Sequence, residues 1–489
     1  MARNWRTKSV EQSILDTDDP DTRLRKDLTW WDLTVFGVSV VVGAGIFTVT
    51  ASTFANITGP AISVSFVIAA VTCALAALCY AEFASTIPVA GSAYTFSYAT
   101  LGEFVAWIIG WDLILEFAVG AAVVAKGWSS YLGTVFGFAG GTLTLGAFTF
   151  DWGALLIIGI VSTLLVLGTK LSSNFSAVIT VIKVGVVLLV VVVGSMHFKA
   201  SNLTPFIPPS ESGKGAPGTG VDQTVFALMT GAHGSHYGFY GLLAGASIVF
   251  FAFIGFDVVA TTAEETKNPQ RDVARGILAS LAIITVLYVA VAFVLSGMVR
   301  YSDLRDAGEH PNLATAFGLN GVHWAATVIS IGALAGLTTV VMVLVLGQSR
   351  IIFAMARDGL LPNSLARTGS HGTPVRVTVM VAVLIAIAAT AFPVSKLEEM
   401  VNVGTLFAFV LVSAGVVILR RTRPDLERGF RAPFVPVLPI LSIGACVWLM
   451  LNLSVLTWIR FLVWMALGVV IYVAYGRRNS VLGRRAAAE

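Results

Sequence analysis

Apolar runs long enough to cross a lipid bilayer recur along nearly the whole chain, and they constrain its fold more than any other feature. A bilayer core takes roughly 20 residues of α-helix. Of the 489 residues, 56% are hydrophobic and only 12% are charged, which excludes a water-soluble globular protein of this size. We predict an all-α integral membrane protein with twelve transmembrane helices, at about 30–55, 60–81, 101–126, 153–171, 173–198, 242–265, 274–298, 323–356, 377–393, 398–420, 436–456 and 459–476.

The basic residues are distributed unequally between the connecting loops. Twelve crossings place both termini on one side of the membrane, and 23 of the 31 Lys and Arg residues then fall on that side, with only six opposite. Because basic residues are enriched in cytoplasmic loops, we expect a multi-pass protein of the plasma membrane with both termini cytoplasmic. The net charge of +4 then reflects topology. The expected partner is the lipid bilayer, and nucleic acid is not indicated.

Glycines interrupt two of the apolar stretches. Gly43 and Gly45 lie in "VVVGAGIF" (40–47) of the first stretch, and Gly255 lies in "FFAFIGFDVV" (250–259) of the sixth. A glycine inside a helix costs about 1 kcal/mol relative to alanine, so these residues either let another helix pack closely or mark a break in the helix. The two interruptions lie about 210 residues apart at matching depths. That pattern is typical of an inverted repeat whose first helices unwind at the bilayer midplane.

We therefore predict a 5+5 inverted repeat with broken helices one and six, followed by two extra C-terminal helices. The first 29 residues are charged and lack the apolar core of a signal peptide. The predicted segments are a cytoplasmic tail (1–29), repeat one (30–198), an extracellular loop (199–241), repeat two (242–420), a cytoplasmic loop with helices eleven and twelve (421–476) and a C-terminal cytoplasmic tail (477–489).

Unwinding within a membrane has a chemical consequence. Backbone N–H and C=O groups released from a helix find no water in hydrocarbon, so they are tolerated only where they line a cavity. Half-helix N-termini favour an anionic group, whereas free carbonyls and half-helix C-termini favour a cationic one. A ligand that carries both charges a few ångströms apart fits both, and a free α-amino acid is such a ligand.

Several longer stretches resemble one known superfamily. "GAGIF" (43–47), "FAFIGFDVVATTAEETKNPQRDVARGI" (251–277) and "GQSRIIFAMARDGLLP" (347–362) are similar to the amino acid, polyamine and organocation superfamily of secondary transporters. "GWDLILEF" (110–117) and the lysine in "VITVIKVGVVLL" (178–189) resemble its cationic amino acid transporter group. The resemblance spans essentially the whole chain. It implies a secondary active permease for L-amino acids that works by alternating access.

The resemblance also implies roles for residues at the two interruptions. The backbone N–H groups of Gly43, Ala44 and Gly45 are expected to receive the substrate carboxylate, although the family often has Ser or Thr where Ala44 stands. Phe251 is expected to close over the ligand as part of an outer gate. The substrate amino group is expected to bind the backbone carbonyls of Val41, Phe251, Ala252 and Ile254.

Lys183 lies near the centre of its span, where an uncompensated ammonium costs about 2.5–3.5 kcal/mol. Removal from water disfavours the charged form of a lysine, so a proton carrier is one reading and a fixed ion pair is the other. The resemblance implies that Lys183 occupies the place of sodium in sodium-coupled relatives, between spans one and eight, with Thr338 and Thr339 as candidate neighbours. The expected coupling ion is thus a proton, with no cofactor and no metal. If sodium binds there instead, Lys183 must point elsewhere.

Two acids share one face of the third span. Asp112 and Glu116 are four residues apart on the predicted helix. The resemblance implies that Glu116 takes part in selectivity or coupling, while the alternative for both residues is a neutral, hydrogen-bonded packing role. Asp257 follows the second interruption and is expected to cap the N-terminus of the second half-helix.

A membrane enzyme, a channel and a transporter with a different coupling ion or substrate are the alternative functions. A membrane enzyme needs a catalytic constellation, and all six histidines fall in predicted loops or near span ends, so no catalytic residues are expected. A channel needs a filter loop or a ring of charges, and paired breaks favour alternating access. A sodium-coupled or exchange-type transporter of cationic amino acids or polyamines stays open. Because the residues around both breaks are apolar, we expect small or medium neutral amino acids such as alanine to bind at least as well as arginine.

Overall fold

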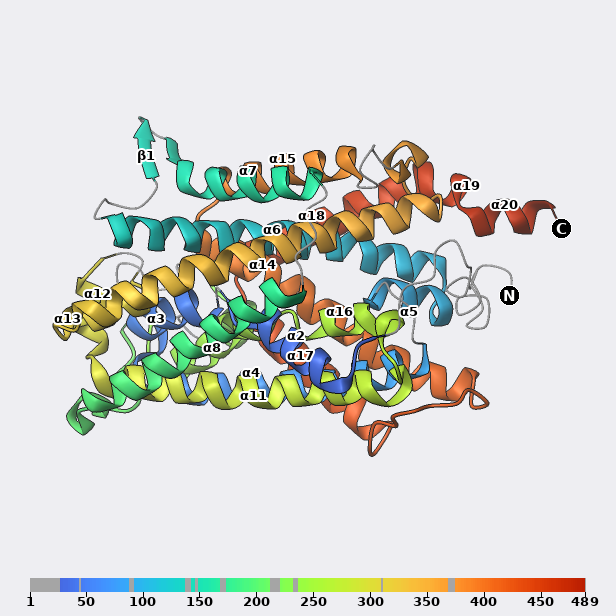
Figure 1. The fold of residues 1–489 in the computed structure, drawn as a ribbon. Helices are drawn as coiled ribbons and strands as arrows, with labels where there is room; N and C mark the ends of the chain where they lie inside the picture. Colours follow the sequence, from blue (N-terminus) through green and yellow to red (C-terminus); the bar gives the residue numbers. More distant parts are fainter. Residues whose placement is uncertain are drawn as a thin grey trace.

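The computed structural model describes residues 27–43, 45–87, 92–136, 142–145, 148–167, 173–211, 220–231, 236–308, 311–367 and 374–488. These residues form an elongated bundle of long helices (Figure 1). Strands β1 (Thr142–Leu145) and β2 (Phe148–Asp151) pair antiparallel in a short hairpin, with Thr142 opposite Asp151. The predicted all-α membrane class is confirmed.

The helices that build the first half of the chain are α2 (Trp30–Val41), α3 (Thr50–Thr53), α4 (Ile62–Thr86), α5 (Ser92–Thr100), α6 (Glu103–Phe136), α7 (Trp152–Val166), α8 (Ser173–Met196), α9 (Val225–Thr230) and α10 (Gly238–Val249). Those of the second half are α11 (Pro269–Met298), α12 (Tyr301–Asp306), α13 (Leu313–Leu319), α14 (His323–Arg357), α15 (Val375–Ala391), α16 (Val394–Thr422), α17 (Val437–Leu451), α18 (Val455–Ile471), α19 (Arg477–Asn479) and α20 (Val481–Ala488).

Tighter or wider helical turns connect or extend several of these helices. The 3-10 segments are η3 (Gly59–Ala61), η4 (Ala200–Leu203), η5 (Gly220–Asp222), η6 (Phe250–Phe253), η7 (Phe256–Glu265) and η8 (Asn363–Ala366). The π-helical segments are η1 (Gly45–Val49), η2 (Phe54–Thr58) and η9 (Tyr472–Gly476).

Within the described residues, eight helical segments are long and apolar enough to cross a membrane, and four shorter apolar helices accompany them. The long segments are Gly45–Thr86, Glu103–Phe136, Val178–Met196, Gly238–Ala260, Pro269–Met298, His323–Arg357, Val394–Thr422 and Val455–Asn479. The shorter ones are α2, α7, α15 and α17. Each of the twelve predicted stretches contains helix, while the number of crossings stays a prediction.

One boundary differs clearly from the prediction. Helix α6 continues to Phe136, beyond the predicted end at residue 126. Residues 127–136 read "GWSSYLGTVF" and are less apolar than the preceding turns. The apolar stretch therefore ends before the helix does. The extra turns carry Tyr131, whose hydroxyl donates to the carbonyl of Phe47 at 2.6 Å.

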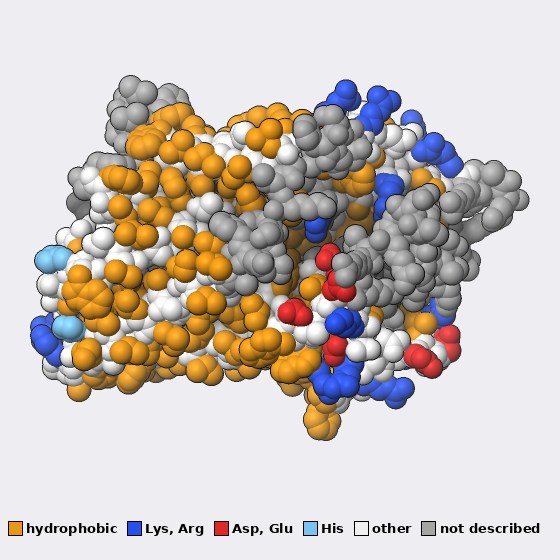
Figure 2. Space-filling model, viewed as in Figure 1, with side chains coloured by type: hydrophobic (Ala, Val, Ile, Leu, Met, Phe, Trp, Pro, Cys, Tyr) orange, Lys and Arg blue, Asp and Glu red, His pale blue; other side chains and the backbone are white. Residues whose placement is uncertain are grey.

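Helix α6 lies at the centre of the bundle and packs against α14, α16, α7 and α15. Of its apolar window, 94% is buried, compared with 22% for the segment that contains α18. The outer helices keep large exposed apolar side chains such as Val181, Val192, Ile331 and Val463, a surface that suits contact with lipid. Figure 2 shows that apolar side chains cover most of the visible face and that Lys and Arg gather mainly toward one end.

Ionic and polar contacts join the helix ends at the predicted cytoplasmic side. Arg420 near the end of α16 forms a bidentate pair with Glu82 near the end of α4, with N to O distances of 2.8 and 2.6 Å. At the start of α6, the buried carboxylate of Glu103 accepts hydrogen bonds from Tyr472, at 3.0 Å, and from Ser480. Figure 1 places α5, α19 and α20 at this end, and α12, α13 and β1 at the other.

Candidate functional site

The first predicted interruption is present between α2 and η1. Helix α2 ends at Val41, and Val42 is extended, with φ −69° and ψ 94°. The chain resumes helical structure at Gly45 as a π-helical turn. Ala44, which was expected to contact the carboxylate, lies outside the described residues.

The second predicted interruption is present between η6 and η7. Ile254 is extended, with φ −63° and ψ 137°, and Gly255 has φ +109°. An L-residue is strained at that φ, so glycine at 255 is what lets the chain turn here. The 3-10 helix η7 follows and carries Asp257 in its first turn.

The two interruptions touch each other. An ideal Cβ built on Gly45 would lie 2.1 Å from the Cα of Ala252, and one built on Gly43 would lie 2.9 Å from the Val340 Cγ2 of α14. The sequence left two readings open for these glycines, close packing or a helix break. Both hold here, because the helix breaks beside Gly43 and Gly45, and Gly45 at the start of η1 lies directly on Ala252 in η6. We call residues 41–45 and 251–255, Ala44 excepted, the paired breaks.

Two carbonyls at the end of α2 are bonded by side chains from other helices. The Val41 carbonyl accepts a hydrogen bond from the Tyr288 hydroxyl of α11 at 2.8 Å. The Ser39 carbonyl accepts one from the Lys183 Nζ of α8, also at 2.8 Å. A carbonyl oxygen has two lone pairs, so the Val41 carbonyl, predicted to bind the substrate amino group, keeps capacity for a second donor.

The predicted residues of the second break lie in the turn that faces Gly45. The Phe251 carbonyl accepts from the Ile254 N–H at 3.3 Å. Phe251 and Ala252 are buried, and Ile254 is half-buried. The structure thus brings together the predicted substrate-binding residues that it describes.

Lys183 is almost fully buried, with 1% of its surface exposed. Its stem crosses Gly336 of α14, whose ideal Cβ would lie 3.1 Å from the Lys183 Cγ, and its ammonium reaches Ser39 of α2. The side chain therefore lies between the first and eighth predicted spans. None of the ion pairs within the described part of the chain includes Lys183, so the fixed-ion-pair reading finds no counterpart there.

The two candidate threonine neighbours of Lys183 face different helices. The Thr339 hydroxyl donates to the Gly336 carbonyl at 2.8 Å, beside the lysine stem. The Thr338 hydroxyl accepts from the Trp128 Nε1 of α6 at 3.1 Å. The Thr339 hydroxyl is thus bonded within α14, at the glycine that contacts the Lys183 stem, and the Thr338 hydroxyl is bonded to α6.

Three buried carboxyl groups lie near one another, two on α6 and one on η7. Asp112, Glu116 and Asp257 each have at most 3% of their surface exposed. Glu116 lies close enough to both aspartates for electrostatic coupling and also contacts Thr405 of α16. The Asp257 carboxylate faces backbone N–H groups at the start of η7, the place expected of an acid at a helix N-terminus.

Asp112 is the member of this group with the fewest contacts. Neither of its carboxyl oxygens has a hydrogen-bond partner within the described residues. The nearby backbone of Gly404 in α16 leaves it room, because an ideal Cβ there would lie 2.8 Å from the Asp112 Oδ1. An unpaired carboxylate is costly in such surroundings, which agrees with the neutral packing role left open for this residue.

Sequence reasoning missed Tyr131, Tyr288 and Gly336. Both tyrosines lie in apolar helices, and a buried tyrosine hydroxyl usually has a hydrogen-bond partner, so their presence alone was a usable signal. What the sequence does not contain is the identity of the partner. That depends on how each helix is rotated about its axis.

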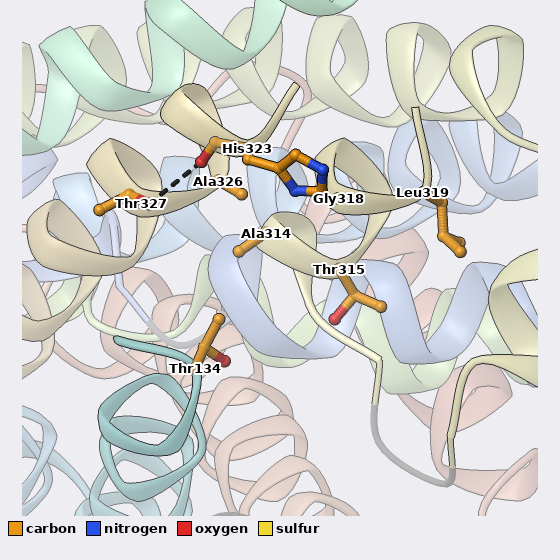
Figure 3. Close-up of a pocket in the computed structure, with 8 residues that line it drawn as sticks. All are labelled: Thr134, Ala314, Thr315, Gly318, Leu319, His323, Ala326 and Thr327. Carbon is orange, nitrogen blue, oxygen red and sulfur yellow. Dashed lines mark hydrogen bonds between the residues drawn. The ribbon is translucent and has the colours of Figure 1, made fainter. Parts of the chain in front are cut away.

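A surface pocket lies away from the paired breaks. It has a volume of about 390 Å³ and is lined by Thr134, Ala314, Thr315, Gly318, Leu319, His323, Ala326 and Thr327. These residues come from the end of α6, from α13 and from the start of α14 (Figure 3). The Thr327 hydroxyl donates to the His323 carbonyl at 3.0 Å, so this hydroxyl is hydrogen-bonded within α14. None of the predicted site residues lines this pocket.

Comparison with known proteins identifies the family. Residues 28–475 match the family described as amino acid permease. The chain is 40% identical to the branched-chain amino acid permease BcaP of Bacillus subtilis, over 98% of this chain and 99% of that relative. It is 38% identical to the methylthioribose transporter of the same organism, over 99% and 100% of the two chains.

A plant relative extends the comparison. The chain is 32% identical to the vacuolar cationic amino acid transporter 4 of Arabidopsis thaliana, over 98% of this chain and 96% of that one. These relatives are permeases and transporters, not enzymes, and the predicted superfamily is confirmed. The chain belongs to the amino acid permease family.

Proposed function

We propose that this amino acid permease works by alternating access, with the paired breaks as its substrate site and the proton as its coupling ion. The observation that carries the proposal is the contact between the paired breaks at Gly45 and Ala252. The buried ammonium of Lys183 bonds the Ser39 carbonyl in the last turn of α2, just before the first break. Unwound backbone within a bilayer is tolerated where it lines a ligand cavity. The same segments are therefore the natural place for a zwitterionic substrate.

The polarity of the two segments supports a specific orientation of the substrate. The backbone N–H groups of Gly43, Ala44 and Gly45 come directly before or at the start of the helical turn η1, and we propose that they bind the carboxylate. The carbonyls of Val41, Ala252 and Ile254 suit the ammonium group. Since Ala44 offers no hydroxyl, the carboxylate would be held by backbone donors.

Proton coupling follows from the Lys183 contact. A charged ammonium forms a stronger hydrogen bond to the Ser39 carbonyl than a neutral amine does. Loss of the proton would loosen α2 from α8, and α2 forms one side of the substrate site. Because the ammonium already lies between α2 and α14, sodium binding at this place would require its displacement, which favours protons over sodium and over pure exchange.

We further propose a neutral aliphatic L-amino acid as the substrate. The side chains beside the paired breaks, including Val340 and Phe253, are apolar, and Glu116 is already close to Asp257 and Thr405. A guanidinium group would meet a desolvation cost of several kcal/mol without a free acid. The relative named as a branched-chain amino acid permease supports this class.

Two other substrate classes are suggested by relatives. One relative is named a methylthioribose transporter and another a cationic amino acid transporter. Methylthioribose has no carboxylate and no ammonium group, so it would leave the polar ends of the paired breaks unused. Arginine would use both ends but bring an unpaired side-chain charge.

The membrane arrangement is proposed as predicted above. It has twelve crossings in a 5+5 inverted repeat with two extra helices, cytoplasmic termini and a plasma-membrane location. Labelling of single cysteines in intact cells tests it. Cysteines placed at residues 206 and 425 should react from outside and only after permeabilisation, respectively.

Uptake into reconstituted vesicles tests the transport proposal. Labelled alanine should accumulate under an inward pH gradient without sodium, saturate with concentration, and produce no single-channel current. Leucine, valine and isoleucine should compete, while arginine, polyamines and methylthioribose should compete weakly. Competition by arginine at a tenfold lower concentration than any neutral amino acid would overturn the neutral-substrate proposal, and sodium-driven uptake would overturn the proton proposal.

A further inference from the structure

Helix α14 carries two glycines on the face that packs against α8. Gly332 and Gly336 are four residues apart, so they lie one above the other on the helix. An ideal Cβ on Gly332 would lie 2.3 Å from the Val186 Cγ2, and one on Gly336 would lie 3.1 Å from the Lys183 Cγ. Small residues at this spacing let two membrane helices approach closely. The two α8 residues, three apart, occupy the groove that the glycines leave.

The stem of Lys183 lies along the Gly336 backbone. The ideal Gly336 Cβ would be 3.1, 3.5 and 3.2 Å from the lysine Cγ, Cδ and Cε, respectively. Beyond these carbons, Nζ reaches the Ser39 carbonyl at 2.8 Å. The Thr339 hydroxyl bonds the Gly336 carbonyl and so fixes the backbone beneath the stem. A side chain at position 336 would press on the Cγ and Cε carbons and so displace the stem that carries the ammonium.

We propose that Gly336 is a positioning residue that holds the Lys183 ammonium on the Ser39 carbonyl and thereby sets the proton dependence of transport. This inference rests on the proposed function, in which Lys183 carries the coupling proton. Gly336 touches neither the substrate nor the proton. It acts only through the path of the lysine stem.

Few charged groups face Lys183, so its protonation depends mainly on where its side chain lies. The elements packed against α8 are α2, α11 and α14. Their titratable and charged residues are Asp32 of α2, Arg271, Asp272, Arg275 and Tyr288 of α11, and His323, Arg350 and Arg357 of α14. Arg275 and Arg350 lie about two turns from a helix end. Tyr288 lies deeper in its helix, and its hydroxyl is bonded to the Val41 carbonyl. Burial and the Ser39 contact therefore govern the protonation of Lys183, and both depend on where its stem runs.

The test compares three glycine variants on the same helix. Alanine uptake is measured in reconstituted vesicles as a function of pH, and the melting temperature is measured in parallel. Gly336→Ala should move the midpoint of the pH dependence toward acid by about one pH unit, because the ammonium stays buried but loses its acceptor. Gly332→Ala should lower the melting temperature through Val186 and leave the midpoint in place. Gly347→Ala should change neither, since its Cβ would make ordinary contact with Phe117 at 3.5 Å.

A double variant separates this inference from the proposed function. In the Lys183→Ala background, Gly336→Ala should have no further effect on the pH profile, because no stem remains to be displaced. A wild-type pH profile for Lys183→Ala itself would overturn the proposed coupling role. A pH-independent Lys183→Ala together with an unshifted Gly336→Ala would overturn the positioning role alone.

A milder variant keeps the test open if Gly336→Ala does not fold. Thr339→Val removes the hydroxyl that fixes the Gly336 carbonyl while it retains the side-chain volume. It should move the midpoint in the same direction by a smaller amount. An unchanged midpoint in a folded Thr339→Val protein would then count against the proposal.

Discussion

The two helix breaks resemble each other in sequence but are stabilised in different ways. At the first, the carbonyls of Ser39, Val41 and Phe47 accept hydrogen bonds from side chains of α8, α11 and α6, respectively. At the second, the contacts are local: the Ile254 N–H donates to the Phe251 carbonyl at 3.3 Å, and the Val258 N–H donates to the Gly255 carbonyl at 3.2 Å. The first break is thus bonded by side chains from three other helices. The bonds at the second are local, from its own backbone and from the carboxylate of Asp257 in the turn that follows, while Asn402 of α16 bonds the preceding Ser247 and Ile248 carbonyls.

This difference indicates where a signal can enter the site. A break held by side chains from three helices changes when one of those side chains changes, and one of the three carries an ionisable ammonium group. The ionisable group at the second break, the carboxyl of Asp257, belongs to the first turn of η7 and bonds local backbone N–H groups, so it does not link the break to another helix in this way. We therefore expect proton coupling to act through the first break and the second break to serve as a wall of nearly constant shape. The following predictions test that division, from the largest expected effect to the smallest.

Gly45→Ala should have the largest effect, because it separates the two breaks. The added methyl group would lie 2.1 Å from the Cα of Ala252, and a backbone atom has little freedom to move away. We expect loss of alanine binding and of a monodisperse, folded protein, measured by thermal shift and size-exclusion chromatography.

Gly43→Ala is the matched comparison for that variant. Its methyl group would meet the Val340 Cγ2 at 2.9 Å. Unlike the backbone of Ala252, the Val340 side chain can rotate away, or a second substitution can remove it. We expect weakened binding that Val340→Ala restores in part. Native affinity in folded Gly45→Ala protein would show that the breaks do not press on each other as described.

Lys183→Ala should abolish coupling while leaving part of substrate binding. The variant removes the donor to the Ser39 carbonyl and the proton that it carries. Accumulation of labelled alanine should no longer respond to an inward pH gradient, while exchange of internal for external alanine continues. Lys126→Ala is the control, because the Lys126 Nζ donates to the Ala389 carbonyl of α15 at 2.9 Å, away from the breaks. Equal pH-driven accumulation in both variants would refute the special role of Lys183.

Tyr288→Phe should have an intermediate effect on the first break. It removes one hydrogen bond to the Val41 carbonyl and leaves that buried acceptor short of a donor, which costs about 1–3 kcal/mol. A loss of this size in binding corresponds to roughly a 5- to 150-fold weaker affinity. Tyr131→Phe removes the equivalent bond at Phe47, farther from the predicted ammonium site, and should lower the melting temperature more than the affinity. Calorimetric binding of alanine separates the two outcomes.

Gly255→Ala should have an effect comparable to that of Tyr288→Phe but one that does not depend on pH. Its φ of +109° is unfavourable for alanine, at a cost of about 1–3 kcal/mol for a strained backbone. Its methyl group would also lie 2.9 Å from the Val40 Cγ1. Uptake should fall by the same factor at every pH, with the midpoint unchanged. A shifted midpoint would mean that the second break also responds to protons, and the division between the two breaks would fail.

The parts of the site that could be predicted are those written in local composition. Gly43, Gly45 and Gly255 are conspicuous inside apolar runs, and Lys183 is conspicuous by its depth. These residues needed no knowledge of neighbouring helices. Their approximate places in the fold followed from counting spans.

The parts that could not be predicted depend on helix rotation and on contacts across the bundle. Thr338 and Thr339 are adjacent in sequence, but a helix turns about 100° per residue, so one faces Trp128 and the other the Gly336 carbonyl. The proximity of Glu116 to Asp257 joins residues far apart in the chain. The periodicity of either segment alone does not predict that these two carboxyl groups lie close together.

The buried carboxylate of Glu103 has a consequence for how the protein is made. Its partners Tyr472 and Ser480 follow it in the chain by 369 and 377 residues. At synthesis rates of about 5–20 residues per second, roughly 20 to 75 s separate the appearance of the acid from that of its first partner. Helix α6 therefore enters the membrane with the end that carries Glu103 incomplete. That end is finished only when the last helix has left the ribosome, and a chain that stops before Tyr472 leaves Glu103 without these two donors.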